Sequence, residues 1–110
     1  MRTLAITQNI TLDGSVEMLG DWFDPQAQID DARMAAEMRR QDDACDTVLL
    51  GRQTVTDFRG FWPQQSNDET GISGYLDSVA EHVVSRTLTD PAWQNSTILS
   101  GDPVQQVRRL

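Results

Sequence analysis

Residues 46–63 read DTVLLGRQTVTDFRGFWP, and this stretch decides the fold. Its apolar run, residues 48–50, has the composition of a strand that is buried on both faces. The run ends at Gly51 and Arg52, and the residues that follow predict a short helix over 53–58. A buried strand that leads through glycine into a helix presents backbone N–H groups and a positive side chain, an arrangement that can bind an anion.

The rest of the chain predicts an alternation of strands and helices. Residues 3–10 place Leu4, Ile6 and Ile10 on one side, as expected of a first strand. Further strands are expected at 82–85 and 97–100, and helices at 30–43, at 70–80 and from a cap at Asp102 followed by Pro103. This order predicts an α/β fold with a largely parallel sheet and helices on its faces.

Length and charge restrict the possible functions. A chain of 110 residues is expected to form one domain, 1–110. The net charge of −8 argues against nucleic acid and anionic membrane surfaces as partners. The single Cys45 and single His82 exclude an internal disulfide and a closed structural zinc site, so no metal is expected. Without a long apolar run the chain is expected to be soluble and cytoplasmic, with no membrane segment.

Two predicted strands end in residues that suit a phosphate group. Gly51, Arg52 and Thr54 follow one strand, and Ser85, Arg86 and Thr87 follow the next. Ligands of open α/β sheets lie outside the carboxyl ends of the strands, so both arginines are expected at the same edge. Two guanidinium groups with neighbouring hydroxyls match a phosphate monoester. The alternative is that each arginine lies on the surface and pairs with a nearby carboxylate.

Four blocks of sequence carry a resemblance to a known family: TQNITLDG (7–14), LLGRQTVTDFRGFWP (49–63), HVVSRTL (82–88) and WQNSTILSGDPVQQVRRL (93–110). Together they resemble the dihydrofolate reductase-like family. More narrowly, they are similar to the reductase domain at the C-terminus of the bifunctional riboflavin-biosynthesis deaminase-reductase. The resemblance implies a three-layer α/β/α fold with a mostly parallel sheet, of which this chain covers the first part.

The resemblance also implies a cofactor and a set of site residues. In that family, reduced NADP lies across the strand ends. By position, Gly51, Arg52 and Thr54 would hold cofactor phosphate, and Ser85, Arg86 and Thr87 would lie at the 2′-phosphate. Asp13 would be the polar group near the reacting carbon, and the substrate would be bordered by Trp22, Met34 and Met38. The family often has Lys-Thr-Tyr-Glu where Gln53 to Thr56 stand here. Its Gly-rich pyrophosphate turn would lie beyond Leu110.

Several simpler roles remain open for these residues. Asp13 precedes glycine, so it is equally a turn residue that bonds within its own loop. The tryptophans and methionines are expected to pack in the core unless they border a ligand, and Cys45 is expected to be a small buried group.

The sequence therefore leaves two alternative functions open. One is an NADPH-dependent oxidoreductase that transfers hydride to a small heterocycle such as a pterin or a ribosylaminopyrimidine. The other is a catalytically silent, truncated binding module. In either case a homodimer is expected, because residues 97–99 would lie near an open sheet edge.

Overall fold

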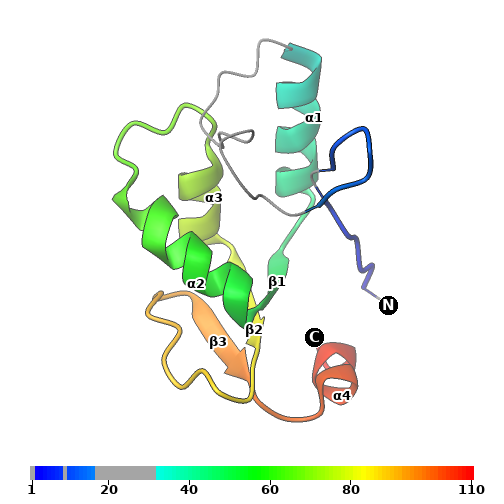
Figure 1. Ribbon diagram of the computed structural model, residues 1–110, viewed down its shortest axis with the longest axis vertical. Coiled ribbons are helices and arrows are strands. Elements are labelled where there is room, and N and C mark those ends of the chain that lie inside the picture. Colours follow the sequence, from blue (N-terminus) through cyan, green and yellow to red (C-terminus); the bar gives the residue numbers. More distant parts are fainter. Residues whose placement is uncertain (1, 9, 17–31) are drawn as a thin grey trace.

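The computed structural model describes residues 2–8, 10–16 and 32–110, which form a mixed α/β structure (Figure 1). Its strands are β1 (Thr47–Gly51), β2 (Ala80–Val84) and β3 (Ser96–Leu99). Its helices are α1 (Ala32–Asp43), α2 (Arg52–Phe61), the short 3-10 helix η1 (Trp62–Gln64), α3 (Ile72–Ser78) and α4 (Pro103–Arg108). The α/β class and the three later strands and their helices were predicted correctly, with boundaries shifted by a few residues.

The strands form a parallel three-stranded sheet in the order β1-β2-β3. In its register Leu50 lies beside Val83, and Val83 lies beside Ile98. The predicted parallel sheet is therefore confirmed for these strands. Within the described part of the chain β3 pairs with β2 alone, so 96–99 does lie at a sheet edge.

The core lies between one face of the sheet and the helices α2, η1 and α3, which Figure 1 shows together on one side of β1 and β2. Val55 of α2 and Val83 of β2 have no exposed surface. The rest of the buried cluster comprises Leu50, Trp62, Leu76 and Trp93. Full burial of an aliphatic side chain of this size stabilises a fold by about 1.5–3 kcal/mol. The prediction that Trp62 and Trp93 pack in the core is confirmed.

Local signals account for the helix boundaries. At α4 the Asp102 carboxylate accepts a hydrogen bond from the Gln105 N–H at 2.9 Å, and Pro103 occupies the first turn, as predicted. The helix α2 continues to Phe61, beyond its predicted end, because Gly60 weakens a helix without ending it. The chain then tightens into η1, with Pro63 in its first turn.

The N-terminal segment corrects one prediction. Residues 3–8 and 10 are not a strand, and their apolar side chains are exposed: Leu4 by 67%, Ile6 by 88% and Ile10 by 63%. Alternation of apolar residues shows which side chains share a face, but a strand also needs a partner for its backbone. Arg2 holds the start of this segment near β1 through Asp46 and Thr47.

Cys45 is a second correction. It was expected to be buried, and it is exposed. The residue lies in the short connection between α1 and β1, where the chain turns at the surface. Cysteine is often a small core residue, and the residue type alone does not show that Cys45 falls in a surface turn.

A buried carboxyl group lies on the core face of β2. Glu81 has no exposed surface, and its Oε2 accepts a hydrogen bond from the Ser96 hydroxyl at 2.6 Å. Its Oε1 has no partner among the described residues. Burial, assisted by the nearby charge of Asp77, raises the pKa of Glu81 above its ordinary value of 4.5, although Ser96 opposes that shift. Ionisation of Glu81 therefore opposes folding.

We predict that Glu81→Gln stabilises the protein at neutral pH. Because the pKa is raised on folding, the carboxyl contributes most below its unfolded value, and that contribution is lost as pH rises through the folded value. Glutamine removes the buried charge, and its amide oxygen can still accept the Ser96 hydroxyl, so the melting temperature at pH 7 should rise by several degrees. Thermal unfolding followed by circular dichroism measures this.

The gain should shrink as the pH falls, because the wild-type carboxyl then becomes protonated, and its raised pKa brings this about at a higher pH than in the unfolded chain. Glu69→Gln, which removes an exposed carboxylate, is the matched control for the change in net charge. A Glu81→Gln protein that melts below the wild type at pH 7 would contradict the assignment of Glu81 as a destabilising buried acid.

Candidate functional site

The carboxyl edge of the sheet gathers the residues in which the sequence predicted phosphate binding. Gly51 lies beside Val84, and Val84 lies beside Leu99. The residues that follow these positions, Arg52 and Ser85, therefore leave the sheet at the same level. Figure 1 shows this edge at the start of α2 and at the ends of β2 and β3.

The first turn of α2 begins at this edge without a side-chain cap. Gly51 occupies the N-cap position in an extended conformation, with φ −86° and ψ 165°. No side chain caps the free N–H groups of the first helical turn. Arg52 and Thr54, in that first turn, are exposed. Free N–H groups and the partial positive charge of a helix N-terminus favour an anion.

The Ser85 side chain forms hydrogen bonds within its own turn. It is buried, and its hydroxyl oxygen accepts hydrogen bonds from the N–H groups of Thr87 at 3.3 Å and Leu88 at 3.0 Å. Those two N–H groups are thus not free for a ligand. Arg86 and Thr87 are exposed at the tip of the turn. Ser85 therefore positions Arg86, and only its hydroxyl proton remains to be donated.

Neither arginine of this edge forms an ion pair with a described residue. In the described part of the chain the ion pairs are Arg2 with Asp46 and Arg40 with Glu37, so Arg52 and Arg86 pair with no carboxylate there. The alternative of two surface arginines that each pair with a carboxylate agrees with the exposure of both side chains, but no such pair forms among the described residues. Two unpaired guanidinium groups at one edge of a chain of net charge −8 form a local positive site.

Asp13 lies in a tight turn far from this edge. Its carboxylate accepts the hydroxyl proton of Thr11, and the Ser15 N–H bonds to the Thr11 hydroxyl oxygen at 2.8 Å. The hydrogen bond from Thr11, followed by one from the Ser15 backbone, lowers the pKa of Asp13. The side chain is therefore a carboxylate at neutral pH. In Figure 1 the 11–16 turn lies beside α1, at the opposite end of the sheet from the start of α2.

The predicted substrate residues are not gathered at the carboxyl edge either. Met34 and Met38 lie on α1, which Figure 1 places at the amino end of β1. Met34 is 53% exposed and Met38 is half-buried, so the expectation that both pack in the core is wrong for Met34. Trp22 lies outside the described residues.

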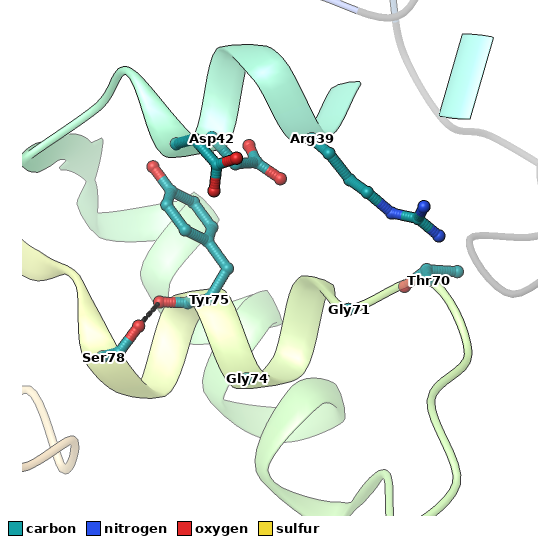
Figure 2. A pocket seen from close by; sticks show the side chains of 8 residues that line it. Arg39, Asp42, Thr70, Gly71, Gly74, Tyr75 and Ser78 are labelled. Carbon is teal, nitrogen blue, oxygen red and sulfur yellow. Dashed lines mark hydrogen bonds between the residues drawn. The ribbon is translucent and has the colours of Figure 1, made fainter. Parts of the chain in front are cut away.

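A pocket that the sequence did not predict lies between α1 and α3 (Figure 2). Its volume is about 360 Å³, and its lining residues are Arg39, Asp42, Asp43, Thr70, Gly71, Gly74, Tyr75 and Ser78. The available signal in the sequence is the pair of glycines at the start of the predicted helix over 70–80, Gly71 and Gly74. Of the predicted cofactor and substrate residues that the structure describes, none lines this pocket.

Comparison with known proteins does not identify the chain. A scan against models of protein families gives no match, and a search of curated proteins gives none. In the part of the chain that the structure describes, no helix has the length and apolar character needed to cross a membrane.

Proposed function

We propose that the carboxyl edge binds the phosphate of reduced NADP and that the chain is part of an oxidoreductase. The observation that carries this proposal is the pair of exposed, unpaired arginines, Arg52 and Arg86, beside the uncapped start of α2. The resemblance of four sequence blocks to the dihydrofolate reductase-like family, with its three-layer fold, agrees with this choice of cofactor.

The residues of the edge fit a phosphate monoester. Arg52 and Arg86 offer planar donor groups, and charge-assisted hydrogen bonds of this kind are worth about 1.5–3 kcal/mol each. The free N–H groups in the first turn of α2 supply further donors, and Gly51 has no side chain that could compete with a ligand for them. The rest of the chain is strongly acidic, so it repels anions elsewhere and leaves this edge as the favoured place for them.

The cofactor would supply the hydride, and the protein would orient it against the acceptor. The acceptor would be a small heterocycle, such as a pterin or a ribosylaminopyrimidine. Asp13 is an ionised carboxylate in its turn, so it suits orientation of a substrate amino group better than donation of a proton. In this reading the active protein is cytoplasmic.

We predict that Arg86→Ala removes most of the preference for the phosphorylated cofactor. If the arginine supplies one charge-assisted interaction, the ratio of the dissociation constants for NADH and NADPH should fall roughly 10- to 150-fold. Titration of tryptophan fluorescence with each reduced cofactor measures both constants. Arg39→Ala, on α1 at the other end of the sheet, is the control and should leave the ratio unchanged.

A second variant tests the helix start. Gly51→Asp places a carboxylate at the cap, where the added Cβ meets no atom within 4 Å, so α2 should stay folded or gain stability. The same carboxylate should repel phosphate and weaken NADPH binding. If wild-type protein binds neither cofactor at millimolar concentration, the reductase proposal is wrong.

An alternative is a binding module without catalysis that dimerises through its sheet edge. Two separate observations favour it: exposed apolar side chains in the N-terminal segment, and a sheet edge at β3 that has no partner strand among the described residues. The side chains of Leu4, Ile6, Ile10 and Leu12 are between 63% and 111% exposed, and β3 ends the described sheet. Soluble proteins normally cover such surface, and a second copy of the chain would do so.

We predict a homodimer that Ile6→Lys dissociates. Ile6 is 88% exposed, so a lysine there should not disturb the fold of one protomer, but it would place a charge in an apolar interface. Thr7→Lys is the matched control, since it adds the same charge at a neighbouring exposed position without replacing an apolar side chain. Sedimentation analysis gives the mass. A monomeric wild type would rule out this dimer.

A further inference from the structure

The pocket between α1 and α3 is separate from the carboxyl edge. Its residues Asp42 and Asp43 end α1, just before β1 begins, and Ser78 ends α3, just before β2 begins. It therefore lies toward the amino end of the sheet, whereas Arg52 and Arg86 follow the opposite ends of the same strands. What binds here is not part of the proposed phosphate site.

One end of the pocket is acidic. Figure 2 shows Asp42 close to the ring of Tyr75, with Asp43 next to Asp42 in the last turn of α1. Partial burial, and then the charge of Asp43, raise the pKa of Asp42. Burial above all, followed by the Cys45 thiol and the charge of Asp42, raises the pKa of Tyr75, so its phenol stays protonated. Two adjacent carboxylates beside a neutral hydroxyl favour a cationic group between them.

The other end of the pocket is basic. Arg39 precedes Asp42 by three residues and Asp43 by four, a spacing at which helix residues can form ion pairs. Neither pair forms in the described structure, although Arg40 does pair with Glu37 on the same helix at 2.6 Å. In Figure 2 the Arg39 guanidinium instead extends toward Thr70, away from Asp42. The pocket thus holds opposite charges apart.

The floor of the pocket is bare helix backbone. Gly71 has φ +80°, which explains its identity, because other residues rarely adopt that conformation. Gly74 lies inside α3, where glycine costs about 1 kcal/mol relative to alanine. No atom lies within 4 Å of the position its Cβ would take, so packing does not explain this glycine. Its absence of a side chain leaves room against the helix for a ligand.

The rim beside Gly71 is held in a fixed shape. Asp68 accepts hydrogen bonds from the N–H groups of Thr70 at 2.9 Å and Ser73 at 2.8 Å. The hydroxyl of Thr70 also donates to Asp68, so it is engaged within the loop. The guanidinium of Arg39 therefore remains the group that can meet an anion at this end.

We propose that this pocket binds a small zwitterion whose ammonium and carboxylate groups are separated by several bonds. The ammonium would lie between Asp42, Asp43 and the Tyr75 hydroxyl, and the carboxylate would receive the Arg39 fork. The carbon chain between them would lie over Gly74. A ligand with either charge alone would leave one end of the pocket unmatched.

A series of ω-amino acids of increasing length tests this site. The probes are glycine, γ-aminobutyrate and ε-aminocaproate, with caproate and hexylamine as controls that each carry one of the two charges. Two-dimensional amide NMR of isotope-labelled protein measures binding residue by residue. The expected result is that affinity rises with the separation of the charges, that both single-charge controls bind at least about tenfold more weakly, and that the shifted amides belong to the ends of α1 and α3.

Variants distinguish the pocket from general charge effects. Arg39→Gln and Asp42→Asn should each weaken binding of the best probe about tenfold or more. Gly74→Ala should abolish binding while raising stability, since it fills the floor and favours the helix. Gly60→Ala is the matched control: it changes another helical glycine with no atom within 4 Å of its Cβ, in α2, and should leave binding unchanged.

Three results would overturn the proposal. The first is that no probe of the series shifts the amides lining the pocket at millimolar concentration. The second is that hexylamine binds as tightly as ε-aminocaproate, because the site would then recognise a cation only. The third is that Gly74→Ala and Gly60→Ala bind the probe equally well. Arg86→Ala should not affect any of these measurements, so failure here is separate from failure of the phosphate site.

Discussion

The pairing of β2 on both of its edges is the constraint on which the rest of the described structure depends. Val83 lies beside Leu50 on one strand and Ile98 on the other, and it has no exposed surface. Because both neighbours are parallel to β2, every strand enters the sheet at one end and leaves at the other. The helices between β1 and β2 must therefore carry the chain from the carboxyl end of the sheet, where α2 begins, back to the amino end, where α3 ends.

This arrangement places the charged residues of the two candidate sites at opposite ends of the sheet. Arg52 and Arg86 follow strands, so they lie at the carboxyl edge, whereas Asp42 precedes a strand and lies at the amino end. Glu81 lies inside the core face of the sheet between these two regions, with Ser96 as its partner. The candidate phosphate site and the proposed zwitterion pocket therefore lie at opposite ends of the sheet, where their charged groups do not neutralise one another.

The sequence predicts those parts of this structure that depend on local signals. The run 48–50 followed by Gly51 identifies a strand and the helix after it, and Asp102 with Pro103 identifies the start of α4. The candidate phosphate residues are placed correctly at strand ends for the same reason. Residues 3–10 carry an equally regular pattern, but a strand depends on a backbone partner that no local pattern reveals.

The pocket could not be predicted because it joins residues that are distant in the sequence. Arg39 and Asp42 come from one helix and Tyr75 from another, and the charges on α1 alone suggest an ordinary i,i+3 pair. The glycines carry the remaining information. Gly71 is required by its backbone conformation, whereas Gly74 and Gly51 are not required by backbone or by packing. Under the two proposals a ligand would complete the contact at Gly51 and at Gly74, where Arg52 and Arg39 form no ion pair among the described residues. Gly60 is equally free of packing contacts, so a glycine of this kind does not by itself identify a site.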